Sequence, residues 1–214
     1  MQVLRALIAV LILAAGPVHA QTYVVDTGPG GASGGATLGE DQWLAAKFTL
    51  TQAETITSIE GWMVYLNSIF SLPVDVVIYG DAGLDEPNTG DLRYEDSFTV
   101  LPSGFSPGWN GVTGISLDLP AGTYWVAFEV TAPSVIGSGA MPPTAAQELP
   151  DYAFWTPTGG WSGNDGLNLG IRLGNGAAQE VPMFGAGRWV LLAVLLALGS
   201  ARLIRRPRTE EVVR

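Results

Sequence analysis

The chain contains no cysteine, and its single histidine is His19, close to the N-terminus. The absence of cysteine excludes disulfides, thiolate zinc sites and cysteine nucleophiles. If the first twenty residues are removed on export, no imidazole remains to act as a base, to bind a metal or to complete a Ser-His-Asp triad. Lys47, the only lysine, lies in an alternating strand pattern that is poorly suited to a Ser-Lys dyad. The sequence therefore predicts a protein that is not an enzyme.

Positive charge is also scarce. Residues 21–187 contain three basic and eighteen acidic residues, a net charge of 3 − 18 = −15. Such a surface repels nucleic acid, which is bound mainly through Lys and Arg contacts to phosphate, so we expect no nucleic-acid partner. The excess of acids keeps the protein soluble or attracts divalent cations, and the sequence leaves both open.

The N-terminus has the pattern of a secretory leader. One basic residue, Arg5, precedes an apolar run over residues 6–15, and small residues lead up to Ala20. This pattern predicts a signal peptide over residues 1–20 that is cleaved after Ala20. The alternative is an uncleaved anchor, although ten apolar residues are short for a membrane span.

The C-terminus carries a second apolar run, over residues 189–204, followed by a basic tail over residues 205–214. A helix of this run would span about 24 Å, somewhat less than a hydrocarbon core of about 30 Å. Trp189 suits one interface, and the arginines that follow the run favour a cytoplasmic tail. We expect one transmembrane helix that anchors the exported chain in the membrane. A buried C-terminal core helix is the alternative.

Residues before and after this run match the plan of a bacterial sorting signal. They are Val181, Pro182, Met183, Phe184, Gly185, Trp189, Arg205 and Arg206. The pattern resembles the C-terminal signals of Gram-negative surface proteins of the PEP-CTERM and IPTL types. The resemblance implies that residues 176–188 form a linker and sorting motif. It further implies that an exosortase-like membrane protease processes the chain near Pro182, for delivery to the cell surface or extracellular matrix.

The segment between the two ends, residues 21–175, has the period of β-strands. Apolar and polar residues alternate over several short segments that Gly, Pro, Asn and Asp separate. The expected strands cover residues 22–25, 43–50, 56–66, 74–79, 94–101, 112–119, 123–131, 152–156 and 167–173. No long helical period precedes Trp189. The pattern predicts an all-β domain, an antiparallel β-sandwich.

One turn and the strand that follows it carry a second, looser resemblance. The sequence Leu119-Pro120-Ala121-Gly122-Thr123 leads into an aromatic strand, and Tyr152 to Trp155 form a similar segment. These segments resemble strands of secreted jelly-roll domains, most of which have no assigned activity. The resemblance implies a jelly-roll-like sandwich.

Aromatic residues near the expected loops are candidate ligand contacts. Flat rings stack on sugar faces, and a carboxylate beside them can bind hydroxyl groups. The candidates are Trp109, Glu129, Tyr152, Trp155 and Trp161. The same rings can instead cap the core, and Glu129 can face solvent.

An acidic segment offers a candidate calcium site. Five oxygen-bearing residues fall within eleven positions: Asp81, Asp85, Glu86, Asn88 and Asp91. Calcium takes six to eight such ligands, but this spacing is not that of a helix-loop-helix calcium loop. A solvated hairpin is the alternative.

The sequence thus favours an exported, non-enzymatic β-sandwich with a structural or adhesive role in the envelope or matrix. A carbohydrate-binding module, with or without calcium, is the second hypothesis. A glycoside hydrolase that uses Glu129 and a second acid is the third, and it requires two carboxylates about 5 to 10 Å apart.

Overall fold

The computed structural model describes residues 22–65, 71–103, 106–131, 139–145, 149–164 and 166–176. All of them belong to one unit of the chain, Met1–Gln179. This described part contains no helix that is long and apolar enough to cross a membrane. The predicted leader, sorting motif and transmembrane helix lie outside the described residues.

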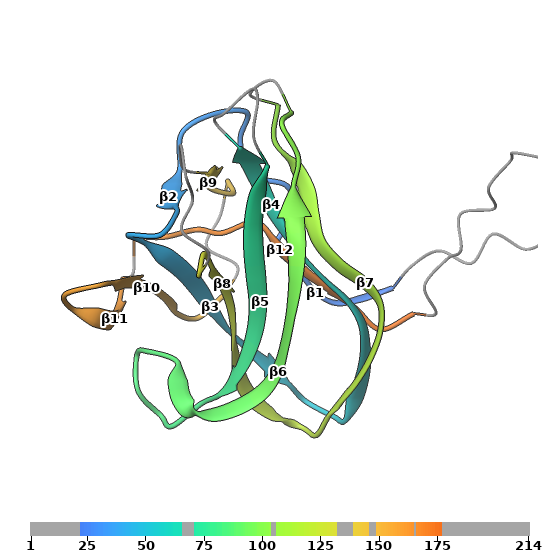
Figure 1. The fold of residues 1–214 in the computed structure, drawn as a ribbon. Coiled ribbons are helices and arrows are strands. Elements are labelled where there is room, and N and C mark those ends of the chain that lie inside the picture. The colour runs from blue at the N-terminus through green and yellow to red at the C-terminus, as the bar shows by residue number, and fades with distance from the viewer. Residues whose placement is uncertain are drawn as a thin grey trace, which may run out of the picture. The chain divides into compact units, whose positions relative to one another are not determined.

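Within the described residues, twelve strands form two antiparallel sheets (Figure 1). In the first sheet the order is β1-β12-β4-β9-β2, and β7 also pairs with β4. Its strands are β1 (Tyr23–Asp26), β2 (Ala36–Leu38), β4 (Glu54–Tyr65), β7 (Gly108–Leu119), β9 (Gly139–Met141) and β12 (Ile171–Gly174). In the second sheet the order is β11-β10-β3-β8-β5-β6. Its strands are β3 (Trp43–Leu50), β5 (Leu72–Gly80), β6 (Asn88–Val100), β8 (Gly122–Glu129), β10 (Tyr152–Thr156) and β11 (Gly160–Gly163).

The core lies between the two sheets because each contributes one apolar face. In β3, Leu44, Ala46, Phe48 and Leu50 point into the core, and the residues between them point away. Ile59 in β4 and Ile171 in β12 meet them from the first sheet, in the same buried cluster. This two-sided burial confirms the predicted all-β class and the antiparallel sandwich.

Most expected strands are present, with shifted ends. The strand expected at 152–156 is β10 and that at 43–50 is β3, whereas β6 begins six residues before the expected 94. The short strands β2, β9 and β11 were not expected. They contain three or four residues each, and glycine, which is depleted in strands, begins β9 and β11. Pairing with neighbouring strands therefore specifies them, rather than alternation of their own residues.

The backbones of β4 and β7 approach closely at Gly111. A Cβ atom there would lie 2.0 Å from the carbonyl oxygen of Ile59, so only glycine fits without a shift of the backbone. In the same strand, Gly108 has no atom within 4 Å of the corresponding position.

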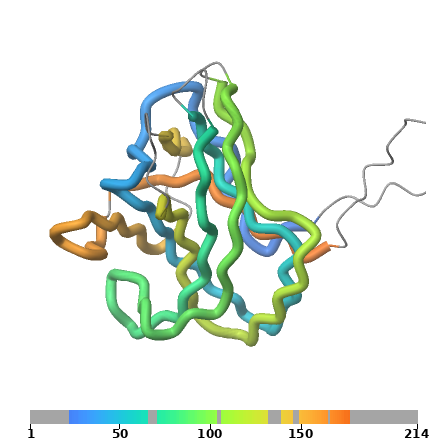
Figure 2. The backbone as a smooth tube through the Cα atoms, viewed as in Figure 1, coloured from blue at the N-terminus to red at the C-terminus, as the bar shows by residue number. Residues whose placement is uncertain are grey.

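Two connections reach the outer face of the second sheet, the face that points away from the core. One is the loop between β5 and β6, and the other is the hairpin of β10 and β11. In Figure 2 the green loop and the orange hairpin lie on the same side of the described domain. Together they build the candidate site.

Candidate functional site

The outer face of the second sheet has a floor of small side chains. Ala153, Ala45 and Ala127 lie opposite one another on β10, β3 and β8, and Val77 on β5 continues the row. All four are at most 2% exposed. They form a second buried cluster with Trp125 and Tyr79, and Trp161 packs against it. The small side chains therefore leave space above this part of the sheet, and large aromatic rings occupy it.

Three tryptophans stand at one end of this floor. Trp155 on β10 lies opposite both Trp43 on β3 and Trp161 on β11. The rings of Trp43 and Trp155 are stacked, with centroids 3.8 Å apart and planes 11° apart. The ring of Trp161 is tilted by 58° to that of Trp43, at 6.3 Å. We call Trp43, Trp155 and Trp161 the tryptophan cluster.

Local chemistry fixes the cluster in place. The indole Nε1 of Trp43 donates a hydrogen bond of 3.1 Å to the carbonyl oxygen of Val130. The β10–β11 turn is closed by a bond from the Gly159 amide to Thr156 Oγ1, at 3.1 Å. Gly160 then adopts a φ of 70°, which favours glycine and turns the chain back so that Trp161 faces Trp155.

A hollow of about 410 Å³ opens beside the tryptophan cluster. The β10–β11 hairpin lines it with Trp155, Gly159, Gly160 and Trp161, and β3 adds Trp43. Glu86 and Pro87 of the β5–β6 connection, Thr89 of β6 and Tyr79 of β5 also line it. We call this the aromatic hollow. Three tryptophans, one tyrosine, one carboxylate and one threonine hydroxyl are among its lining groups, a mixture that is typical of ligand sites.

Lys47 holds the β5–β6 loop against the sheet. Its Nζ lies 2.9 Å from Asp151 Oδ2 and 3.7 Å from Asp81 Oδ1, and it donates a bond of 2.9 Å to the carbonyl oxygen of Leu84. Trp125 Nε1 donates to the same Asp81 oxygen at 3.1 Å. The lysine side chain is only 11% exposed. Its charge is therefore committed to the loop and is not directed at a ligand.

A buried acid lies on the same face of the sheet. Tyr79 Oη donates a hydrogen bond of 2.9 Å to Glu129 Oε1, and Glu129 is 6% exposed. Burial raises the pKa of Glu129 to about 7, and the charges of Asp75 and Glu95 act in the same direction, while the Tyr79 hydrogen bond opposes them. Burial and the Glu129 charge also raise the pKa of Tyr79. Near neutral pH, Glu129 therefore exists in both protonation states.

The structure distributes the five predicted ligand residues over four places. Trp155 and Trp161 both line the aromatic hollow. Glu129 lies on the same sheet face but does not line the hollow, and it is buried rather than facing solvent. Tyr152 is 1% exposed and belongs to the core between the sheets. Trp109 lies on β7 of the other sheet.

The surroundings of Trp109 are structural in character. Its ring meets Trp62 edge-on at 5.4 Å, and the Arg172 guanidinium lies 4.3 Å from its centroid. Arg172 in turn forms a bidentate pair with Glu60, at 2.7 and 2.8 Å. Trp109 and the tryptophan cluster therefore belong to different sheets and cannot contribute to one binding face.

Sequence reasoning did not single out Trp43 and Tyr79. A signal was present: both occupy the phase of their strands that is opposite to the core residues, where a large ring must find another surface to cover. Two strand pairings, β10 with β3 and β10 with β11, bring the tryptophan rings together. Strands β10 and β3 are far apart in the sequence, and β11 was expected to be loop.

The five residues of the candidate calcium site are not gathered around one point. Asp81 is paired with Lys47, Asp91 Oδ2 accepts a bond from Arg93 at 2.7 Å, and Asn88 Oδ1 accepts one from the Gly90 amide. Glu86 lines the aromatic hollow. No group of three or more His, Cys, Asp or Glu that could hold a metal ion occurs in the described ranges.

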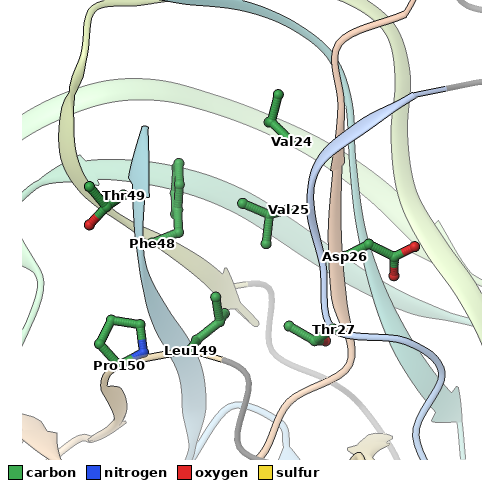
Figure 3. Close-up of a pocket in the computed structure, with 8 residues that line it drawn as sticks. All are labelled: Val24, Val25, Asp26, Thr27, Phe48, Thr49, Leu149 and Pro150. Atoms are coloured by element: carbon green, nitrogen blue, oxygen red, sulfur yellow. The ribbon is translucent and has the colours of Figure 1, made fainter. Parts of the chain in front are cut away.

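A second hollow, of about 320 Å³, lies between β1 and β3 (Figure 3). Val24, Val25, Asp26, Thr27, Phe48, Thr49, Leu149 and Pro150 line it. In Figure 3, Phe48, Val25 and Leu149 approach one another, whereas the carboxylate of Asp26 points away from them. This hollow has both apolar and polar lining residues, and we assign it no chemical role.

The arrangement of the aromatic hollow suits binding better than catalysis. Among the described residues that line it, Glu86 is the only carboxylate, whereas glycoside hydrolysis needs two acids across the substrate.

Comparison of the chain with models of known protein families and with curated proteins gave no match in either case.

Proposed function

We propose that this chain is an exported, surface-sorted β-sandwich that acts by binding and not by catalysis, in a structural or adhesive role in the envelope or extracellular matrix. The observation that carries the binding role is the aromatic hollow. Three tryptophans from β3, β10 and β11 converge there at ring distances of 3.8 and 6.3 Å. Aromatic residues that face a hollow outside the main core are typical of ligand sites.

The sequence ends support the location. The leader over residues 1–20 directs export, and the tail from Val181 to Arg206 resembles a sorting signal for an exosortase-like protease. In this proposal the helix over residues 189–204 holds the chain in the membrane until processing, in a Gram-negative bacterium. The sandwich is then a jelly-roll-like domain of the kind found upstream of such signals.

Localisation is tested by fractionation of cells that carry the full gene, followed by protease treatment of intact cells. We expect the processed chain in the envelope or matrix fraction, with the sandwich accessible to added protease. Intact chain with an uncut leader in the cytosolic fraction would contradict export.

A carbohydrate is the ligand class that the hollow favours. Tryptophan rings stack on the apolar faces of sugars, while Glu86 Oε atoms, Thr89 Oγ1 and the backbone around Gly159 supply partners for hydroxyl groups. The second candidate function is therefore a carbohydrate-binding module. Calcium assistance has less support, because Asp81 and Asp91 already hold basic partners.

Binding is tested with the full chain, purified in a polyoxyethylene detergent because a sugar-based detergent would compete for the site. Immobilised chain is screened against an array of neutral, acidic and amino polysaccharides. We expect binding to at least one class, with loss of at least tenfold in affinity on Trp161→Ala. The matched control Trp109→Ala changes a ring on the other sheet and leaves binding within about twofold. Absence of binding to every class would refute the carbohydrate-binding role.

A further inference from the structure

The aromatic hollow has an electrostatic character that narrows its ligand. Of the residues that line it, Glu86 carries the only formal charge. The connection that supplies Glu86 also contains Asp85 and Asp81, of which Asp81 is paired with Lys47. A ligand that enters the hollow therefore meets negative charge on the loop side and tryptophan rings on the hairpin side.

No free cation offsets this charge in the described part of the chain. Lys47 is shared between Asp81 and Asp151, Arg93 is paired with Asp91 at 2.7 Å, and Arg172 with Glu60 at 2.7 Å. Recognition of a carboxylate or sulfate needs an Arg or Lys that can donate to it. All three basic residues of the sandwich already hold acidic partners of their own.

The geometry of the rings also limits how a ligand can enter. Trp43 and Trp155 lie at contact distance, 3.8 Å, so nothing can insert between them. Trp161 is tilted away from this pair and borders the hollow. Its ring is the member of the tryptophan cluster best placed to present a face to a flat, apolar sugar surface. The carboxylate of Glu86, across the hollow, accepts hydrogen bonds from hydroxyl groups but repels an acidic substituent.

We infer that the aromatic hollow binds neutral hexose units and rejects uronic or sulfated sugars, with Trp161 as the stacking platform and Glu86 as the residue that enforces the charge selection. This inference rests on the proposed carbohydrate-binding role and names the ligand class of the same site. Like charges a few ångströms apart repel each other even at the dielectric constant of a protein surface. An acidic sugar should therefore bind about fivefold to a hundredfold more weakly than its neutral counterpart.

The test uses pairs of oligosaccharides that differ only in oxidation of the C6 alcohol to a carboxylate, on gluco-, galacto- and manno-configured backbones. Binding of each pair to the full chain is measured by calorimetric titration at low and at high salt. We expect the neutral member of at least one pair to bind and its oxidised counterpart to bind at least about fivefold more weakly at low salt. Added salt should narrow the difference, because ions screen the repulsion at Glu86.

Two variants separate the roles of the ring and the carboxylate. Glu86→Gln keeps the shape and one acceptor oxygen but removes the charge, so it should weaken neutral binding through the loss of charge-assisted hydrogen bonds. The ratio of neutral to oxidised affinity should nevertheless fall several-fold, because the repulsion of the carboxylate is gone. Trp161→Phe keeps an aromatic ring over the floor and should weaken neutral binding about threefold to tenfold. This variant guards against unfolding of Trp161→Ala.

The outcomes divide cleanly. If no member of any pair binds and the array is also blank, the proposed carbohydrate-binding role fails. If sugars bind but the oxidised members bind as tightly as the neutral ones, the charge selection is overturned and the binding role stands. If neutral binding is unchanged in Trp161→Ala and Trp161→Phe, the aromatic hollow is not the site.

Discussion

Replacement of Glu129 by glutamine should change how the stability of the sandwich depends on pH. In the folded protein the Glu129 carboxyl is 6% exposed and accepts a bond from Tyr79 Oη. Burial raises its pKa from 4.5 to about 7. The folded state therefore binds a proton more tightly than the unfolded chain does. Glutamine has nearly the same shape, keeps an acceptor for Tyr79 and cannot ionise.

The sign and size of the effect follow from this shift. Between pH 4.5 and 7 the folded state holds more protons at Glu129 than the unfolded state, so the free energy of unfolding falls as pH rises through this range. A shift of about 2.5 units corresponds to about 3 kcal/mol at 1.36 kcal/mol per unit. Below pH 4.5 Glu129 contributes no such penalty, and above pH 7 the full penalty applies.

The assay is urea unfolding of the wild-type full chain and of Glu129→Gln at half-unit steps from pH 4 to 8, followed by tryptophan fluorescence. The difference between the two proteins cancels the titration of every other group that the substitution leaves alone. We expect equal stability near pH 4 and an advantage of about 3 kcal/mol for the variant at pH 8. Parallel curves over the whole range would refute the assignment of a buried, raised-pKa carboxyl to Glu129.

Two further predictions test the elements around the site. Lys47→Met removes the side chain that holds the β5–β6 loop and leaves two acids without their partner, so it should lower the free energy of unfolding by about 3 kcal/mol in urea titrations. Arg93→Ala breaks an exposed ion pair and should lower it by less than about 1 kcal/mol. Equal effects would contradict the buried role of Lys47. Gly111→Ala places a Cβ atom 2.0 Å from a backbone oxygen, so it should lower the free energy of unfolding by about 2 kcal/mol or more and the melting temperature by several degrees. Gly108→Ala in the same strand has open space and should change the free energy of unfolding by less than about 1 kcal/mol. A neutral Gly111→Ala would contradict the β4–β7 register.

The sheet architecture could be predicted because the alternation of apolar and polar residues is visible over a few positions of the sequence. It results from the burial of one face of a sheet in the core. In β3 every second residue is apolar, and burial of that face between two sheets fixes which residues enter the core. The same argument failed for β11, where Gly160 and Gly163 flank Trp161 and Ser162 and no alternation is visible. Cross-strand pairing with β10 forms that strand, and a single sequence does not reveal the pairing.

The candidate site shows the limit of residue type as a guide. Trp155 and Trp161 could be proposed from their places beside expected loops, and both line the aromatic hollow. Trp109 looked equivalent in sequence, yet its strand pairs with β4 in the other sheet. Tyr152 begins the same strand as Trp155, and the one-residue alternation of a strand sends its ring into the core. The sheet and the face on which an aromatic residue lies depend on pairings between strands more than a hundred residues apart, such as β3 with β10.

The acidic segment illustrates a related point. Five oxygen donors within eleven residues satisfy a ligand count, but a metal site also requires that they converge. Here Lys47 and Arg93 are salt-bridged to two of the acids, and Glu86 faces the aromatic hollow. The sandwich has only three basic residues, and their positions decide which acids remain available to bind a metal. These positions could not be predicted from the net charge alone.

Nuclear magnetic resonance of the tryptophan indole groups tests whether the aromatic hollow is the binding surface of this protein. Each of the seven tryptophans gives one Nε1–H signal, and a neutral oligosaccharide that binds to the full chain can be titrated against all of them. We predict that the signals of Trp155 and Trp161 shift in proportion to occupancy, while those of Trp62 and Trp109 on the first sheet stay fixed. Shifts confined to Trp62 and Trp109, with the tryptophan cluster unchanged, would contradict the account.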